Sequence, residues 1–478
     1  MTRTQAIFST LLAYNVLLVA IGLWARQRTH DQEDFFLGGR KMGGWVAALS
    51  ASASSSSAWT LLGVSGAAYA WGISAIWLFP ATLSGFLINW LWVAPRLMKQ
   101  SRAGGSVTLA EFLAGDRENR WFRTAIRLST LIIVFSFLFY IASQFQAAGH
   151  AFENAFGTSP ALSIAIGVAI IVLYTLLGGF WAVSVTDLVQ GLVMAACALM
   201  LPIVSLFAVG GPGGLIEGLR AVSTTAQLQW TGPFTGAMAV AFVVGTLGIG
   251  IGYPGQPHVV NRFMALRDPM ALRTGRAVAL VWAVIIYSGM LLTGWCARVL
   301  FSSEAKSEQI LFEAANQLLP PVLAGIVIAA VLSAIMSTAD SQLLVATSSL
   351  SYDLRQGGSH VADSSGPGLF LSRTVVVAIS VGAMLLGIFA PAEIFSRVLF
   401  AWSALGAAFG PLLLIRLAGY PVRTPAVVAA MATGFGCTLI ANWFFSGAPG
   451  GWVERLVPFA LGLAVGWLGR VRAPVSSR

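Results

Sequence analysis

The chain has 478 residues, of which 57% are hydrophobic and only 10% are charged, and its mean hydropathy is +0.80. Soluble domains carry roughly 25% charged residues, so this composition indicates a polytopic membrane protein and excludes an ordinary soluble enzyme. The net charge of +10 is explained by the Lys and Arg excess of cytoplasmic loops, so nucleic acid is not an expected partner.

The apolar segments predict about thirteen membrane-spanning helices, since a span needs about 20 apolar residues. The first run has no small-residue cleavage site after it, so we expect it to be retained rather than removed as a signal peptide. The expected spans are residues 6–25, 45–71, 74–95, 126–149, 160–180, 184–209, 236–257, 276–301, 321–346, 371–391, 394–418, 424–446 and 454–470.

The charges predict the orientation of the chain. An odd number of spans places the two termini on opposite sides of the membrane. Most Lys and Arg residues, Arg262 among them, then fall in loops on one side; the exceptions are Arg3, Arg220, Arg298, Lys306, Arg397 and Arg455. Because cytoplasmic loops carry this excess, we expect the N-terminus outside and the C-terminus in the cytoplasm of a bacterial-type plasma membrane.

Four consecutive serines at residues 54–57 lie inside the second expected span. Serine side chains compete with the helix by bonding to their own backbone, which favours a break or a bend. Inside a bilayer, broken backbone is tolerated only where protein or a cavity surrounds it. Freed carbonyls and hydroxyls suit a small hard cation. The alternative is a small-residue face for tight helix packing.

A second interrupted helix is predicted in the seventh span, where residues 245–258 hold repeated glycines together with Pro254 and Pro257. Interrupted helices in corresponding positions are typical of inverted-repeat transporters with a site at the membrane midplane. The alternative is two unrelated flexible helices.

We expect one transmembrane transporter domain, residues 1–478, with these parts: a first span and loop (1–44), a first repeat (45–209), a second repeat (236–420) and two C-terminal spans (421–478).

Two carboxylates are expected at membrane depth, Asp187 in the sixth span and Asp340 in the ninth. Each costs roughly 2.5–3.5 kcal/mol on insertion scales, which is usually tolerated for an ion or proton pathway or for an interior pair. Ser337 and Ser341 share one helix face near Asp340, and Thr338 adjoins it. These oxygens suit a hard cation. The alternative is a polar contact between helices.

Other chemistries find no support in the sequence. Cys197, Cys296 and Cys437 lie in or near apolar spans without paired spacing, so neither a disulfide framework nor a metal site is expected. No Gly-rich loop ends in Gly-Lys-Ser/Thr, which argues against an ATP-driven pump. No nucleophile–base spacing is visible, so we expect no enzyme activity, and no obligate protein partner is evident.

A series of short motifs runs from the first span to about Pro411. They are Leu37-Gly-Gly-Arg40, Ala48-Leu-Ser-Ala51 with Trp59, Thr175-Leu-Leu-Gly-Gly-Phe180, Ala182-Val-Ser-Val-Thr-Asp187, Gly252-Tyr-Pro-Gly-Gln-Pro-His258, Arg262-Phe-Met-Ala265, Met336-Ser-Thr338 and Gln342-Leu-Leu-Val345. By these motifs the chain resembles the sodium/solute symporter family, and most closely its sodium/proline symporter branch.

The resemblance implies an all-α membrane protein of about thirteen transmembrane helices, with a five-plus-five inverted-repeat (LeuT-like) core and two discontinuous helices. It implies a principal sodium site formed by carbonyls of Ala53, Ser56 and Ala334 and hydroxyls of Ser337 and Thr338. It implies a second sodium site at Asp187, Ser337, Thr338, Asp340 and Ser341. The expected substrate site comprises Ser55, Ser57, Ala58, Trp59, Tyr140, Ile249, Tyr253 and Gln256.

Three positions depart from the proline branch. Ser55 stands where that branch has an aspartate tied to sodium coupling, although Asp340 offers a carboxylate from another helix. Ala58 replaces a glycine and Ile249 replaces a tryptophan, and both changes reshape the expected substrate pocket. The coupling ratio and the substrate are therefore the properties that the resemblance transfers least well.

The expected function is secondary active transport, in which Na+ entry drives uptake of a small organic solute, above all an amino acid such as proline. The expected partners are this small-molecule substrate, the sodium ion and the lipid bilayer. Three alternatives stay open: another solute such as sialic acid or an organic acid, proton coupling through Asp187 and Asp340, and a ligand-sensing relative.

Overall fold

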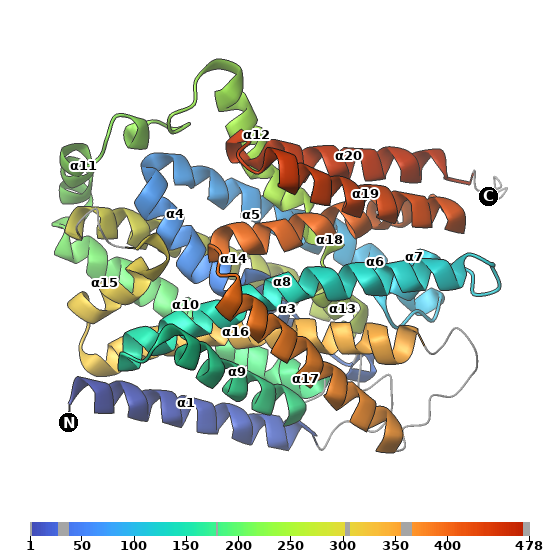
Figure 1. Cartoon of the computed structure of the whole chain (residues 1–478), viewed down its shortest axis with the longest axis horizontal. Helices are drawn as coiled ribbons and strands as arrows, with labels where there is room; N and C mark the ends of the chain where they lie inside the picture. The colour runs from blue at the N-terminus through green and yellow to red at the C-terminus, as the bar shows by residue number, and fades with distance from the viewer. Residues whose placement is uncertain (1, 27–37, 178–179, 302–305, 355–365, 472–478) are drawn as a thin grey trace.

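The computed structural model describes residues 2–26, 38–177, 180–301, 306–354 and 366–471 (Figure 1). Helices account for 87% of the structure, and no strand forms within these ranges. Leu37 of the first family motif and residues 178–179 of the third lie outside the described residues. The all-α expectation is confirmed.

The main helices, in chain order, are α1 (Arg3–Arg26), α3 (Gly44–Ala58), α4 (Val64–Trp71), α5 (Leu78–Leu87), α6 (Ala94–Ala103), α8 (Phe122–Phe156), α9 (Pro160–Leu177), α10 (Phe180–Ala208), α12 (Gly236–Ile251), α13 (Pro257–Ala265), α14 (Pro269–Leu300), α16 (Pro321–Ser348), α17 (Gly366–Phe389), α18 (Ile394–Leu417), α19 (Thr424–Phe445) and α20 (Trp452–Leu468). Shorter helices join them: α7 (Leu109–Ala114), α11 (Gly211–Val222) and α15 (Ile310–Leu318). They pack side by side in one bundle (Figure 1).

Eleven helical stretches among the described residues are long and apolar enough to cross a membrane. One of them, Gly44–Ala103, contains 60 residues, about three times the length that one crossing needs. It is interrupted at Gly72, whose φ of 70° lies in the left-handed region. Pro160–Leu173 is a shorter apolar segment. The number of about thirteen spans therefore stays a prediction.

The centre of the bundle is formed by α16 and α18. Buried residues make up 83% of the apolar window in Pro321–Ser351 and 89% of that in Ile394–Leu417. α16 packs against α1, α3, α8 and α10, and α18 packs against α8, α19 and α20. Helices that are apolar all round require such burial, and α3 and α16 thereby meet along their small and hydroxyl-bearing faces.

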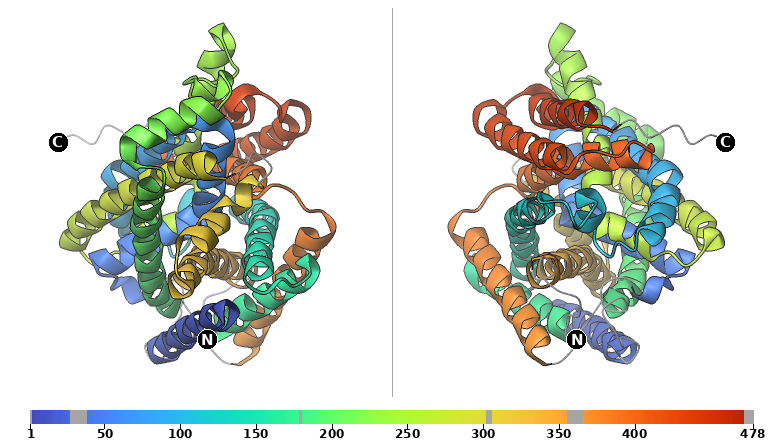
Figure 2. Two further views of the ribbon diagram at one scale, coloured as in Figure 1. Left: turned by 90° about the vertical axis from the view of Figure 1, so that its left-hand side faces the viewer. Right: turned by 90° about the vertical axis from the view of Figure 1, so that its right-hand side faces the viewer.

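The peripheral helices turn apolar side chains outward. α1 exposes Phe8, Leu12 and Val16, while α19 exposes Trp443 and Phe444. Both helices lie at the edge of the bundle in end-on view (Figure 2). Exposed apolar side chains along whole helices are what a lipid-facing surface requires. The start of α1 and the end of α20 lie at opposite ends of the long axis (Figure 1).

Candidate functional site

The first helix break lies at Ser57, inside the serine run. Ser57 has φ 53° and ψ −177°, a left-handed φ that is costly for a residue other than glycine and persists only where the surroundings hold it. Gln144 Oε1 accepts a hydrogen bond from the Ala58 N–H at 3.0 Å. Ser57 Oγ accepts from the Trp59 N–H at 3.1 Å and from the Tyr140 hydroxyl at 3.3 Å. The expected discontinuity is confirmed, and Gln144 is a partner that sequence reasoning missed.

The second break separates α12 from α13, with a short 3-10 turn at Tyr253–Gly255 between them. Gln256 is fully buried, and its Nε2 donates to the carbonyls of Gly252 at 3.0 Å and Trp402 at 2.9 Å. Trp402 Nε1 in turn donates to the Ile249 carbonyl at 3.2 Å. The freed backbone of this break is therefore bonded by side chains within the protein, as the bilayer requires.

Hydroxyl groups join α3 to α16. Thr338 Oγ1 donates to the Ser54 carbonyl at 3.1 Å, and Ser54 Oγ donates to the Ser337 carbonyl at 2.9 Å. Ser337 Oγ donates to the Ala334 carbonyl of its own helix at 3.3 Å. All four residues are fully buried. Ala334, Ser337 and Thr338, three expected ligands of the principal sodium site, thus lie at the seam between the two helices.

The other two expected ligands, Ala53 and Ser56, lie just before the break and are fully buried. The Ser56 carbonyl accepts a hydrogen bond from Thr60 Oγ1. The Trp59 N–H also donates to this carbonyl, so a cation bound there would replace that hydrogen bond. Ser55 Oγ donates to the Ser52 carbonyl at 3.0 Å, so the hydroxyl that replaces the aspartate of the proline branch bonds within its own helix.

A buried ion pair, between Asp187 and Arg262, lies next to this seam and contacts Ser54. Asp187 Oδ2 accepts from Ser50 Oγ at 2.6 Å and from Arg262 Nη2 at 3.3 Å, and the two charged side chains are 0% and 1% exposed. Buried charges are tolerated when they are paired and hydrogen-bonded. Ser54 Oγ lies 3.4 Å from the same carboxylate oxygen and 3.0 Å from Ser341 Oγ. The pair therefore contacts the residues expected at the second sodium site.

Arg262 is the residue that sequence reasoning misplaced. The charge distribution assigned it to a cytoplasmic loop, whereas the structure buries it and directs Nη2 to Ser341 Oγ at 2.5 Å and Nε to Ser50 Oγ at 3.0 Å. Its Cζ also lies 5.3 Å from the centroid of the Phe180 ring. A signal was present, because two carboxylates at membrane depth require a counter-charge.

Asp340 is held differently from Asp187. Its Oδ1 accepts from Ser341 Oγ at 3.3 Å. Within the described ranges, Asp187 Oδ1 and Asp340 Oδ2 have no hydrogen-bond partner. Asp187 contacts the Arg262 guanidinium directly, and Asp340 is linked to it through the Ser341 hydroxyl. When both carboxylates are ionised, the group carries one excess negative charge. One monovalent cation or one proton would balance it.

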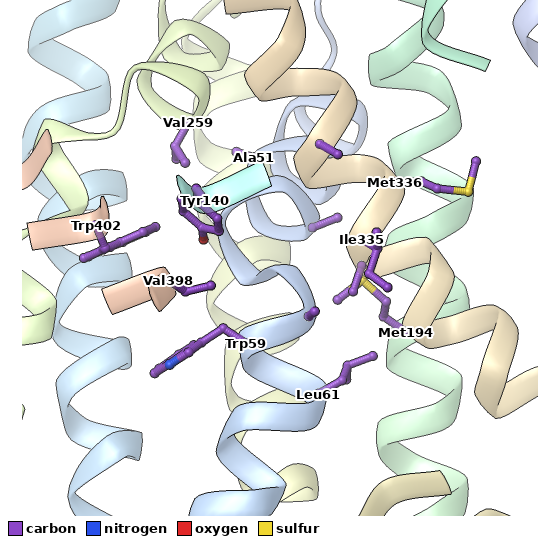
Figure 3. Close-up of a cluster of buried hydrophobic side chains, with 14 of the residues drawn as sticks. Ala51, Trp59, Leu61, Tyr140, Met194, Val259, Ile335, Met336, Val398 and Trp402 are labelled. Atoms are coloured by element: carbon purple, nitrogen blue, oxygen red, sulfur yellow. The ribbon is translucent and has the colours of Figure 1, made fainter. Parts of the chain in front are cut away.

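Aromatic residues flank the first break on one side. Trp59, Tyr140 and Trp402 lie on the same side of the broken helix (Figure 3). The Trp59 ring lies 5.5 Å from that of Phe395, and Tyr253 lies 4.6 Å from Trp402. Trp59 Nε1 is buried without a hydrogen-bond partner among the described residues. Of the expected substrate residues, Ser57 and Tyr140 are in contact. The Ser55 hydroxyl and Gln256 Nε2 donate to backbone carbonyls, while Gln256 Oε1 is buried without a hydrogen-bond partner among the described residues.

Known proteins match nearly the whole chain. Residues 35–434 match the Sodium:solute symporter family. The chain belongs to this family. It is therefore a solute transporter and not an enzyme.

Similar curated proteins are bacterial proline transporters. The Osmoregulated proline transporter OpuE of Bacillus subtilis is 34% identical over 461 residues, which cover 95% of this chain and 92% of the relative. The High-affinity proline transporter PutP of the same organism is 34% identical over 454 residues, covering 93% and 94%. The Sodium/proline symporter of Escherichia coli is 32% identical over 434 residues, covering 89% and 85%.

Solved structures show the same fold at low identity. A Na+-coupled sialic acid symporter, in its substrate-bound outward-open state, matches with a TM-score of 0.79 and 18% identity over 98% of this chain and 99% of its own. MHP1, a nucleobase-cation-symport-1 family transporter, matches with a TM-score of 0.51 and 14% identity, covering 92% and 94%. These similarities support the inverted-repeat, LeuT-like architecture.

Proposed function

We propose that this protein is a sodium-driven symporter that imports proline or an amino acid of similar size. The observation that carries the proposal is the hydroxyl-lined seam between α3 and α16 beside the break at Ser57. A seam of carbonyls and hydroxyls suits a hard monovalent cation. The curated relatives, which are proline transporters over most of the chain, support proline as the solute.

The principal sodium site is assigned to this seam. Its ligands are the carbonyls of Ala53, Ser56 and Ala334 and the hydroxyls of Ser337 and Thr338. Thr338 Oγ1 already bonds to the Ser54 carbonyl across the seam at 3.1 Å, so oxygens of the two helices lie within hydrogen-bond distance of each other there. A cation bound by both helices holds them together, which favours one conformation of the transporter over another.

The substrate pocket is assigned to the aromatic side of the two breaks. Ser57, Ala58 and Trp59 form its floor at the first break, with Tyr140 and Tyr253 beside them and Ile249 and Gln256 from the second break. Broken helices present helix ends at this depth, and the positive end of a helix dipole favours a substrate carboxylate. Trp59, with an unpartnered Nε1 among the described residues, offers both an apolar face and a donor.

A second cation site is assigned to Asp187, Ser337, Thr338, Asp340 and Ser341. Arg262 neutralises one of the two carboxylates, Asp187 and Asp340, so the site binds at most one further monovalent cation. This observation also favours the second candidate function, in which a proton on Asp187 or Asp340 accompanies or replaces the second sodium ion. The N-terminus is assigned to the outside and the C-terminus to the cytoplasm, with repeats at residues 45–209 and 236–420.

The test is uptake of labelled proline by proteoliposomes that contain the purified protein. An inward sodium gradient should drive accumulation, and replacing external sodium with choline at constant pH should abolish it. Uptake that survives this replacement and follows an inward proton gradient would instead support proton coupling. If proline is not accumulated, a thermal-shift screen of amino acids, sialic acid and carboxylates, with and without sodium, identifies the substrate class.

A further inference from the structure

A chain of hydroxyl groups connects the second helix break to the first. The Tyr287 hydroxyl, on α14, lies 3.2 Å from the Tyr253 hydroxyl and 3.3 Å from Thr60 Oγ1. Thr60 Oγ1 in turn donates to the Ser56 carbonyl. Thr60, Tyr253 and Tyr287 are all at most 2% exposed. Neither Thr60 nor Tyr287 belongs to the residues assigned above to the sodium or substrate sites.

The direction of these hydrogen bonds follows from the number of protons. A carbonyl oxygen only accepts, so the single hydroxyl proton of Thr60 is used on Ser56. The bond between Tyr287 and Thr60 must then use the proton of Tyr287. The bond between Tyr253 and Tyr287 likewise uses the proton of Tyr253. The oxygen of Tyr253 is therefore left as an acceptor on its remaining side.

Tight packing holds the Tyr253 end of this chain in place. The Tyr253 ring lies 4.6 Å from Trp402 and 5.4 Å from Phe86, measured between ring centroids. On the remaining side, a Cβ at Gly85 would lie only 2.1 Å from Tyr253 Cδ2. Packed interiors transmit displacements rather than absorb them. A shift of the Tyr253 hydroxyl is thus passed to Tyr287 instead of being taken up by a cavity.

We propose that Tyr287 is a positioning residue that couples substrate binding at Tyr253 to sodium binding at Ser56. The inference rests on the proposed function, because it takes the Ser56 carbonyl as a sodium ligand and Tyr253 as a wall of the substrate pocket. A substrate group that binds to Tyr253 moves its hydroxyl. The displacement passes through Tyr287 to Thr60 and changes the hydrogen bond from Thr60 to the Ser56 carbonyl. Hydrogen bonds in such chains polarise one another.

The series of hydrogen-bonded hydroxyl groups also restricts the substrate group that Tyr253 recognises. Since its oxygen only accepts, the group must carry an N–H or O–H donor, as the amino or imino group of an amino acid does. An N-alkylated analogue without an N–H donor loses this contact. The aromatic rings around Tyr253 accept the apolar part of the same molecule.

The experiment measures the coupling between the two ligands in purified protein. The sodium concentration that gives half-maximal thermal stabilisation is determined without proline and at saturating proline, and the ratio of the two is the coupling factor. Couplings between sites are typically about 5–150-fold. Tyr287→Phe and Thr60→Val each interrupt the chain while keeping the shape of the side chain. We expect either variant to reduce the coupling factor about 5-fold or more. In Tyr287→Phe, which keeps the hydrogen bond from Thr60 to the Ser56 carbonyl, the sodium concentration measured without proline should change less than about 2-fold.

The matched control is Thr293→Val on α14, because the Thr293 hydroxyl is fully buried and donates only to the Gly289 carbonyl of its own helix at 2.9 Å. It should keep the wild-type coupling factor. A wild-type coupling factor in Tyr287→Phe and Thr60→Val would overturn the inference. Equal weakening of sodium and proline binding with an unchanged ratio would also overturn it, since that is the result of a purely structural role.

Failure of the proposed function gives a different result. If the wild-type protein binds no proline or its proline binding ignores sodium, the proposed function and this inference fall together. If the wild-type protein shows coupling, only the variants decide on Tyr287. Size-exclusion chromatography shows which variants are folded, and Thr60→Val supplies the test if Tyr287→Phe does not fold.

Discussion

Arg262 Nη2 lies 3.3 Å from Asp187 Oδ2 in the interior of the bundle, with 1% and 0% of the two side chains exposed. The pair joins α13, the C-terminal half of the second broken helix, to α10. Ser50 on α3 contacts both of its members, at 2.6 Å and 3.0 Å. The cluster of Ser50, Asp187 and Arg262 thus connects both broken helices, through α3 and α13, to the continuous helix α10.

This pair predicts a specific pattern of stability. Removing one partner of a buried ion pair costs about 3–5 kcal/mol, because the other charge is left unpaired. Arg262→Gln or Asp187→Asn alone should therefore lower the thermal midpoint of the purified protein strongly. The double variant should be more stable than Arg262→Gln alone, because it leaves one buried carboxylate, Asp340, without the Arg262 counter-charge instead of two.

The control for this experiment is an exposed ion pair of the same type. Arg267 Nε lies 2.7 Å from Asp268 Oδ2, with 61% and 36% of the side chains exposed. Solvent-exposed pairs contribute little to stability, so Arg267→Gln should leave the thermal midpoint nearly unchanged. Equal effects of Arg262→Gln and Arg267→Gln would contradict the role of the buried pair.

The seam between α3 and α16 predicts the sodium dependence of transport. Ser337→Ala combined with Thr338→Ala removes two hydroxyl ligands, and a hydrogen bond or ligand contact to a charged group is worth about 1.5–3 kcal/mol. The sodium concentration for half-maximal proline uptake should rise about 10-fold or more. Ser348→Ala is the matched control, because among the described residues Ser348 Oγ bonds only to the Val345 carbonyl of the same helix. Unchanged sodium dependence in the double variant would refute the site.

Local chemistry explains what the sequence could predict. The break at Ser57 and the break around Tyr253 follow from serine back-bonding and from glycine and proline, which act within a few residues of the chain. The partners could not be predicted in this way. Arg262 meets Asp187 across 75 positions of sequence, and Gln144 reaches the Ala58 N–H across 86.

The departures from the sequence-based expectation share a physical cause. Hydropathy treats an arginine as a loop residue because it counts the cost of burial and not the partner that offsets it. For the same reason Tyr287, an unremarkable aromatic residue in an apolar span, gave no signal until its hydroxyl was seen between two others. Long-range pairing between helices is the property that a pattern along one chain does not contain.

Asp353 predicts a dependence of stability on pH. It lies beyond the apolar span Pro321–Ser351; burial, followed by repulsion from Glu111, raises its pKa from 3.8 to about 8, although the hydrogen bond from Thr108 Oγ1 lowers it. A raised pKa means that the folded state binds the proton more tightly. The stabilisation is therefore complete below pH 4 and is lost as the pH rises towards 8, with a slope of up to about 1.4 kcal/mol per pH unit.

The measurement is the thermal midpoint between pH 5 and pH 9 for the wild-type protein and Asp353→Asn. Asparagine keeps an acceptor for the Thr108 hydroxyl, which lies 3.0 Å from Asp353 Oδ1, but it does not titrate. The wild-type midpoint should fall more steeply with rising pH than that of the variant. Parallel curves would show that Asp353 does not titrate in this range.

The last prediction concerns the position of the carboxylate that balances sodium. Ser55 is 4% exposed and bonds to the Ser52 carbonyl, so it supplies no charge to the seam, whereas Asp340 has one carboxylate oxygen without a partner in the described part of the chain. Asp340→Asn should therefore raise the sodium concentration for half-maximal uptake about 10-fold. If the charge acts from either helix, Ser55→Asp combined with Asp340→Asn should recover most of that loss. Asp340→Asn with wild-type sodium dependence would instead make Asp340 an interhelical partner only, and no recovery in the double variant would mean that the carboxylate must act from α16.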